Sequence, residues 1–173
     1  SIICFPELCI TSYTCQDLFA SQLLLDQAEL MLMRLIETTR SYNIVSIVGV
    51  PVTYQGMLLN CAVVFGSGKI YGVVPKSYLP NYKEFYEMRW FTPAATLPQG
   101  EVHLAGQNVP IGVNLVFETM ACKFGVELCE DLWAPVPPSS HLSLAGAEII
   151  FNLSASNDCI GKHEYLKSLV AQQ

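Results

Sequence analysis

Apolar residues in this chain gather in short runs, and the spacing within the runs alternates between that of strands and that of helices. Continuous apolar runs of about 4 to 8 residues are typical of buried strands, whereas apolar positions that recur every three or four residues are typical of an amphipathic helix. This alternation favours an α/β fold. The predicted strands are 1–8, 45–52, 58–65, 69–74, 102–104, 109–117, 124–128 and 149–153.

Helices are predicted at three places along the chain. Residues 20–40 form an amphipathic pattern whose apolar stripe would face the core. Residues 137–145 begin with a proline and stop at a glycine, and residues 164–173 form a helix without a stop signal. Gly66-Ser67-Gly68 separates two strands and predicts a hairpin. The stripe of the first helix consists of Leu24, Ala28, Met31 and Leu35.

Composition indicates one folded domain that acts on a small molecule. The chain has 173 residues, of which 51% are hydrophobic, and this is enough to bury one core. A net charge of -6 and only nine Lys and Arg argue against a nucleic-acid surface. No apolar run approaches the roughly 20 residues that cross a membrane. We expect a single domain over residues 1–173 that binds neither nucleic acid nor a membrane.

The seven cysteines lie scattered through apolar stretches. No Cys-x-x-Cys or Cys/His spacing suggests zinc, so no metal site is expected. Reduced thiols of this kind are typical of the cytoplasm, which is the predicted location. Most buried cysteines act as small hydrophobic residues.

Three reactive residues stand where predicted strands end: Glu7, Lys76 and Cys129. A charge at the end of a buried strand is costly to desolvate unless it is paired, so the three residues invite a shared site. In such a site Glu7 would take the proton of a Cys129 nucleophile, and Lys76 would stabilise an oxyanion. The alternative is a packed and inert thiol at Cys129.

The segments around these residues resemble the signature regions of the nitrilase, or carbon-nitrogen hydrolase, superfamily, in the same order. More narrowly, the chain is similar over almost its whole length to the glutaminase domain of glutamine-dependent NAD synthetases. The segments that carry the resemblance are Phe5-Pro-Glu7-Leu, Pro75-Lys76-Ser-Tyr-Leu-Pro-Asn-Tyr82-Lys-Glu84-Phe-Tyr, Leu128-Cys129-Glu-Asp-Leu-Trp133, Pro135-Val-Pro-Pro138 and Asn152-Leu-Ser-Ala-Ser156.

The resemblance implies a four-layer α-β-β-α sandwich, in which two sheets pack face to face and helices cover the outside. It also implies association into a homo-oligomer. Because members of the family carry further strands and helices at both ends, we expect this chain to be an internal fragment of a longer protein.

The activity that the resemblance implies is hydrolysis of the side-chain amide of glutamine through a thioester on Cys129. The ammonia would pass to a C-terminal NAD synthetase domain that converts deamido-NAD to NAD. ATP and magnesium would be needed only at that domain. No cofactor is expected in this chain, which has no phosphate-cradling glycine motif.

Four more residues receive roles from the resemblance. Glu84, eight residues after Lys76, would be the second glutamate that orients the lysine, and its alternative is a surface charge. Tyr82, Trp133 and Ser156 fall where glutaminase domains of this type contact glutamine. Their alternatives are packed aromatic rings and a helix-capping serine.

Other functions stay open at this point. A different amidase or carbamoylase of the superfamily would share the same reactive residues, whereas a non-catalytic oligomerisation domain would need none of them. A papain-like site would need a histidine, and none of His103, His141 and His163 stands in a recognisable catalytic context.

One position departs from the family pattern. Ser12 stands where the family usually has glycine. If this position requires a positive φ, serine adds strain of about 1 kcal/mol.

Overall fold

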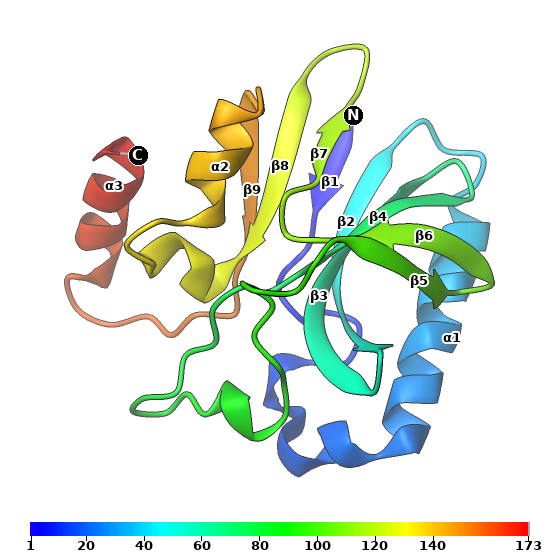
Figure 1. The fold of residues 1–173 in the computed structure, drawn as a ribbon, viewed down its shortest axis with the longest axis horizontal. Coiled ribbons are helices and arrows are strands. Elements are labelled where there is room, and N and C mark those ends of the chain that lie inside the picture. Colours follow the sequence, from blue (N-terminus) through cyan, green and yellow to red (C-terminus); the bar gives the residue numbers. More distant parts are fainter. Residues whose placement is uncertain (173) are drawn as a thin grey trace.

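The structure is a computed structural model that describes residues 1–172 (Figure 1). Its strands are β1 (Ile2–Cys4), β2 (Val45–Tyr54), β3 (Met57–Gly66), β4 (Lys69–Pro75), β5 (Gly100–Leu104), β6 (Gln107–Ile111), β7 (Val116–Glu118), β8 (Lys123–Leu128) and β9 (Ile149–Leu153). Its helices are α1 (Gln22–Thr38), α2 (Pro138–Leu144) and α3 (Lys162–Gln172). Short 3-10 segments are η1 (Tyr13–Ala20), η2 (Glu87–Arg89) and η3 (Cys129–Trp133). The predicted α/β class is confirmed.

The strands form two sheets. One sheet has the order β1-β2-β3-β4-β6-β5, and the other has the order β7-β8-β9. Strands β2, β3 and β4 pair antiparallel, and the turn between β3 and β4 is the hairpin predicted at Gly66-Ser67-Gly68. In the larger sheet β1 pairs parallel with β2 and β4 pairs parallel with β6, and in the smaller sheet β8 pairs parallel with β9.

Side-chain alternation along β3 explains the layers. Successive side chains of a strand point to opposite faces, so one strand can serve two cores. Leu59, Cys61, Val63 and Phe65 join a core that includes the buried face of α1. Ala62 and Val64 join a second core with Phe124 and Val126 of β8.

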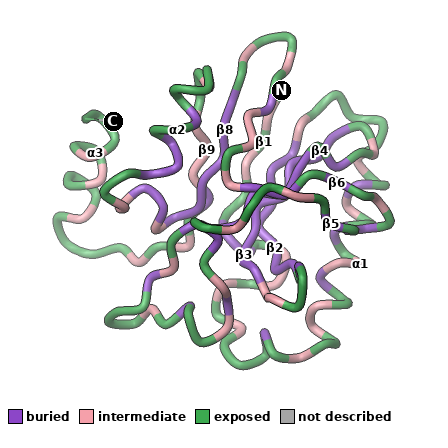
Figure 2. The backbone as a smooth tube through the Cα atoms, in the orientation of Figure 1, coloured by how far each residue is buried: buried purple, intermediate pink, exposed green. Residues whose placement is uncertain are grey.

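The two sheets therefore pack face to face, with α1 outside the larger sheet and α2 outside the smaller one (Figure 1). A fully buried Val, Leu or Phe side chain contributes about 1.5 to 3 kcal/mol, so the core between the sheets holds them together. The expected α-β-β-α sandwich is confirmed. Figure 2 shows burial concentrated in the central strands, whereas α3 has no buried residue.

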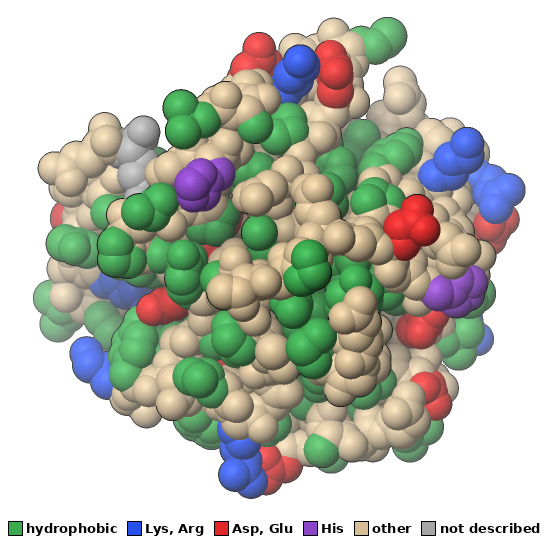
Figure 3. Space-filling model, in the orientation of Figure 1, with side chains coloured by type: hydrophobic (Ala, Val, Ile, Leu, Met, Phe, Trp, Pro, Cys, Tyr) green, Lys and Arg blue, Asp and Glu red, His purple; other side chains and the backbone are tan. Residues whose placement is uncertain are grey.

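Apolar side chains also reach the surface near α2, α3 and β9 (Figure 3). Exposed large apolar residues in these three elements include Leu144, Ile149, Tyr165 and Val170. Within residues 1–172, every helix is too short or too polar to cross a membrane.

The predicted apolar stripe of α1 was partly wrong. The buried residues are Ala28, Leu32 and Ile36, while Met31 lies at the exposed edge. The apolar arc of this helix is wider than the strip that the sheet covers, so the sequence pattern alone did not select the buried row.

Two predicted strands have different bounds. The segment 109–117 is not one strand, because it leaves one sheet at Ile111 and enters the other at Val116. An apolar run does not distinguish one buried strand from two. The strand expected over 1–8 ends at Cys4, shortly before Pro6, whose nitrogen has no hydrogen to donate to a sheet.

The last strand and helix also differ from expectation. β9 was predicted to be buried, but only Leu153 is, because one edge of this strand pairs with β8 and the other edge has no partner strand within residues 1–172. The terminal helix begins at Lys162, and Gln173 lies outside the described residues.

Ser12 adopts the conformation that glycine tolerates best. Its φ is 85° and its ψ is 146°, a region almost restricted to glycine. Its hydroxyl accepts a long hydrogen bond from the backbone N–H of Thr14 at 3.4 Å, which offsets little of the strain.

We predict that Ser12→Gly raises the free energy of unfolding by about 1 kcal/mol, because it removes this strain. Urea denaturation would measure the change. Ser41→Gly is the matched control, since Ser41 is exposed and its φ is not positive; it should be neutral or destabilising by up to about 1 kcal/mol. A destabilised Ser12→Gly protein would contradict the interpretation.

Candidate active site

The two packed sheets bring three chain segments together, and these segments carry Glu7, Lys76 and Cys129. Glu7 lies in the turn after β1, Lys76 directly follows β4, and Cys129 directly follows β8. All three residues are buried. The ends of β4 and β8 meet because the two sheets pack face to face.

The turn that carries Glu7 lies unusually close to β2. A Cβ atom at Gly49 would be 2.1 Å from the backbone nitrogen of Leu8, so only glycine allows this approach. The N–H of Ile10 donates to the carbonyl of Gly49 at 3.1 Å and fixes the turn there. A missing side chain on β2 thus determines where the Glu7 carboxylate lies.

Lys76 lies between two buried carboxylates. Its Nζ is 2.6 Å from Glu7 Oε1 and 2.7 Å from Glu87 Oε1. Asn60 Nδ2 donates to Glu7 Oε1 at 2.8 Å, and the Tyr13 hydroxyl donates to Glu87 Oε1 at 2.7 Å. The result is one buried network with a single cation at its centre.

The second oxygen of Glu7 is also held. Oε2 accepts the backbone N–H of Ala155 at 3.1 Å. Asn60 Oδ1 is a buried acceptor for which no donor lies within hydrogen-bond distance in residues 1–172. The hydrogen bonds of Glu7 within residues 1–172 therefore come from Lys76, Asn60 and the backbone of Ala155, and both of its oxygens are held.

The charged groups of this network shift the pKa values of Lys76 and Glu87. Burial alone would lower the pKa of Lys76, but the neighbouring Glu7 and Glu87 carboxylates raise it above its ordinary value. Lys76 therefore stays an ammonium. Burial raises the pKa of Glu87, the Lys76 ammonium opposes this shift, and the Glu7 charge adds to it.

Cys129 occupies a strained turn next to these charges. Its φ is 40°, which is uncommon for a residue other than glycine and is the kind of strain found at functional sites. Burial, followed by the negative charge of Glu7, raises the pKa of its thiol to about 11. The Lys76 ammonium and a hydrogen bond with Ser154 act in the opposite direction. At neutral pH the thiol is protonated and needs a base to become a nucleophile.

A cavity of about 420 Å³ opens onto Cys129. The predicted contact residues Tyr82, Trp133 and Ser156 all line it, as does Glu84. The Tyr82 hydroxyl donates to the Glu130 carboxylate at 3.0 Å. Burial, followed by this hydrogen bond, raises the pKa of Tyr82 to about 12.

A cation, Lys162, also lines this cavity. Lys162 Nζ donates to Ser156 Oγ and to Asn157 Oδ1, and it lies 6.0 Å from the centre of the Trp133 ring. The Trp133 ring stacks on Tyr165 at 5.6 Å. The cavity is thus lined by the Glu130 carboxylate, by the Lys162 ammonium and by aromatic rings.

The role expected for Glu84 was wrong. Glu84 is exposed and bonds to Asn157 at the cavity wall, whereas the residue that holds Lys76 is Glu87. The chain after Tyr86 turns inward through η2, which buries Glu87. Both glutamates follow the lysine closely, and sequence distance did not separate the buried one from the exposed one.

Sequence analysis also missed several residues of the site. Asn60 looks like an ordinary polar residue in β3, and Tyr13 and Lys162 lie in segments with no distinctive pattern. The signal for Glu130 was its position next to Cys129, where the sequence analysis gave it no role. Only the tertiary contacts reveal the other three residues.

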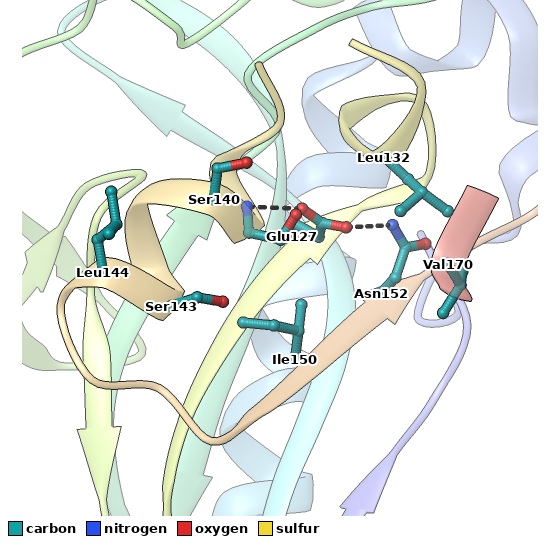
Figure 4. Close-up of a pocket in the computed structure, with 9 residues that line it drawn as sticks. Glu127, Leu132, Ser140, Ser143, Leu144, Ile150, Asn152 and Val170 are labelled. Carbon is teal, nitrogen blue, oxygen red and sulfur yellow. Dashed lines mark hydrogen bonds between the residues drawn. The ribbon is translucent and has the colours of Figure 1, made fainter. Parts of the chain in front are cut away.

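A second cavity, of about 530 Å³, is lined by residues of β8, α2 and β9 and does not include Cys129 (Figure 4). Glu127 lies at its base and accepts the N–H of Ser139 at 3.0 Å and Asn152 Nδ2 at 3.1 Å. Asn152 Nδ2 is also 3.5 Å from the carbonyl oxygen of Cys129. Glu127 therefore ties α2 and β9 to the strand that carries the cysteine.

Taken together, a strained cysteine, a buried carboxylate and a buried ammonium at the meeting edge of two facing sheets define a cysteine hydrolase of the nitrilase type. The comparison with family models agrees: the chain belongs to the carbon-nitrogen hydrolase family, whose model matches residues 1–169.

Individual relatives are more specific. The chain is 39% identical over 163 residues to the glutamine-dependent NAD(+) synthetase of Mycobacterium tuberculosis, covering 92% of this chain and 24% of that protein. It is 35% identical over 166 residues to the human glutamine-dependent NAD(+) synthetase, covering 91% and 23%.

A solved structure gives the same likeness in three dimensions. The glutamine-dependent NAD(+) synthetase from Cytophaga hutchinsonii matches with a TM-score of 0.84 and 28% identity, over 98% of this chain and 27% of that chain. This chain therefore spans about a quarter of the length of the relatives that it matches.

The corrected assignment of the second glutamate can be tested by two matched variants. Glu87→Gln should lower the free energy of unfolding by about 1 to 3 kcal/mol, because it removes a buried, charge-assisted hydrogen bond to Lys76. Glu84→Gln changes an exposed carboxylate and should have an effect below about 0.5 kcal/mol. Urea denaturation of both proteins measures the difference, and equal effects would contradict the assignment.

Proposed function

We propose that this chain is the glutaminase part of a glutamine-dependent NAD synthetase, and that it hydrolyses the side-chain amide of glutamine. The observation that carries the proposal is the Glu7, Lys76 and Glu87 cluster beside Cys129, in a chain whose relatives are named as such synthetases. Fold alone would not choose a substrate. The cavity chemistry supports glutamine in particular.

The first half of the reaction forms a thioester. Glu7 takes the proton of the Cys129 thiol, and the sulfur attacks the amide carbon of glutamine. The carbonyl oxygen becomes an oxyanion, which the Lys76 ammonium and a backbone N–H of the Cys129 turn stabilise. Glu7 then gives the proton to the amide nitrogen, the carbon–nitrogen bond breaks, and ammonia leaves.

The second half restores the enzyme. Glu7 takes a proton from water, and the resulting hydroxide attacks the thioester carbon. The sulfur–carbon bond breaks, glutamate leaves, and the sulfur regains its proton. Glu7 thus serves as the base and as the acid in turn.

The cavity fits the polar end of an amino acid. Glutamine carries an α-ammonium and an α-carboxylate, and the cavity offers Glu130 for the first and Lys162 for the second. Tyr82 and Trp133 supply aromatic surface for the aliphatic part of the side chain. An aliphatic amide without this charged head group would leave Glu130 and Lys162 unused.

Partners and location follow from the proposed function. Ammonia would be used by a C-terminal synthetase domain of the parent protein, and ATP and magnesium would bind there. We propose the cytoplasm as the compartment. The exposed apolar side chains near α3 and β9 support packing against other parts of the parent protein or against another copy of it.

A second candidate is another amidase or carbamoylase of the same superfamily. It would use Glu7, Lys76 and Cys129 in the same way. The opposite charges of Glu130 and Lys162, which line the same cavity, favour an amino-acid substrate over a simple amide. A test with glutamine and an uncharged amide separates the two.

We predict that Cys129→Ala in the full-length protein abolishes NAD formation from glutamine and leaves NAD formation from free ammonia largely intact. The reason is that only the first reaction needs the thioester. The measurement is NAD formation with each nitrogen source, with hydrolysis of glutamine and of propionamide by the unchanged protein as the substrate control. Equal loss with both nitrogen sources would contradict the proposal, as would faster hydrolysis of propionamide than of glutamine.

A further inference from the structure

Asp131 is a buried carboxylate that the proposed reaction does not use. It is 1% exposed and lies in η3, two residues after Cys129. The pKa of Asp131 is raised to about 7, because the effect of burial outweighs the backbone N–H groups of Leu128 and Tyr78, which lower it. A buried carboxylate needs hydrogen-bond donors around it, and Asp131 has such donors.

The donors come from two distant parts of the chain. Oδ1 accepts the N–H of Ser77 at 3.0 Å and the N–H of Tyr78 at 2.8 Å. Oδ2 accepts the N–H of Leu128 at 3.0 Å. Ser77 and Tyr78 directly follow Lys76, and Leu128 directly precedes Cys129.

One rigid group therefore spans the two sheets at their reactive ends. Lys76 follows the strand β4 of the larger sheet, and Cys129 follows the strand β8 of the smaller one. The two oxygens of a carboxylate are held at a fixed separation, so the peptide groups bonded to them are fixed too. The backbone of Lys76 has a further anchor, because its N–H donates to the carbonyl of Asn60 at 2.8 Å.

Capping of η3 does not account for all three hydrogen bonds. The cap needs only Oδ2, which accepts the N–H of Leu128 at the start of η3. Oδ1 makes both of its bonds to the segment after Lys76, 53 and 54 residues away in sequence. The half of the carboxylate that crosses between the sheets serves no local purpose in η3.

We propose that Asp131 is a positioning residue, whose carboxylate fixes the Lys76 ammonium relative to the Cys129 sulfur by tying together the peptide groups beside them. This inference rests on the proposed function. A shift of about 1 Å between reacting groups can cost about 100-fold in rate. The clamp therefore acts on the chemical step more than on the binding of glutamine.

Asp131→Asn is the sharpest test, because asparagine has the same shape. Its amide oxygen can still accept the N–H groups of Ser77 and Tyr78, but its NH₂ group would face the N–H of Leu128, donor against donor. In the full-length protein we expect kcat for glutamine to fall about 100-fold, while KM changes less than about threefold. Hydrogen exchange should show that the Leu128 amide loses protection while those of Ser77 and Tyr78 keep theirs.

The control is Asp17→Asn. Asp17 is an exposed carboxylate that accepts Arg89 Nε at 2.6 Å and Trp90 Nε1 at 2.9 Å, away from the cysteine cavity. This variant should keep kcat within about twofold. Both variants are assayed well below their melting temperatures, so that a loss from partial unfolding is not counted.

Two results would overturn the proposal: kcat of Asp131→Asn within about twofold of the unchanged protein, or a loss that disappears on cooling. If Asp131→Asn does not fold, hydrogen exchange of the backbone amides in the unchanged protein is the deciding measurement. The three amides should then be protected alike, and exchange of the Leu128 amide at the rate of an exposed one would overturn the clamp. Failure of the unchanged protein to hydrolyse glutamine would refute the proposed function instead, since amide exchange tests the clamp independently.

Discussion

The site depends on one buried ammonium held between two carboxylates. Lys76 lies within 2.7 Å of both Glu7 and Glu87, and the side chains of all three residues are buried. Removal of the Lys76 ammonium would leave two buried carboxylates without a counter-charge, and breaking a buried ion pair in this way typically costs about 3 to 5 kcal/mol. The surrounding fold must therefore keep these side chains together. In the proposed reaction this ammonium is the group that stabilises the oxyanion.

The sandwich meets this requirement by joining segments that are far apart in sequence. Glycine at position 49 lets the Glu7 turn approach β2, and facing sheets bring the ends of β4 and β8 to one place. Asp131 and Glu127 then tie the cysteine turn to its surroundings through backbone N–H groups and Asn152. The strain at Cys129 can persist because so many contacts determine this turn.

Much of this arrangement could be predicted from the sequence. Apolar runs located most strands, and a charge or thiol at the end of three of them indicated Glu7, Lys76 and Cys129. What the sequence could not show is which side chains turn inward within irregular segments. Glu84 and Glu87 are both acidic and lie close together, and only the inward turn at η2 buries the second one.

The same limit explains the other differences. The split of segment 109–117 and the exposed edge of β9 depend on which sheet a strand joins, and local pattern does not contain that information. Asn60, Tyr13 and Lys162 contribute through contacts with residues distant in sequence. The sequence indicated the reactive groups well, and the tertiary structure was needed to find the groups that hold them.

The central claim is that Glu7 is the base for a thiol that is protonated at neutral pH. The most direct measurement compares glutamine turnover with alkylation of Cys129 by iodoacetamide at pH 8 in Glu7→Gln. The Glu7 charge raises the thiol pKa, so its removal should leave alkylation as fast as before or faster. Turnover should fall at least about 100-fold, because no group remains to move the proton. Parallel loss of turnover and alkylation, or undiminished turnover, would contradict the account.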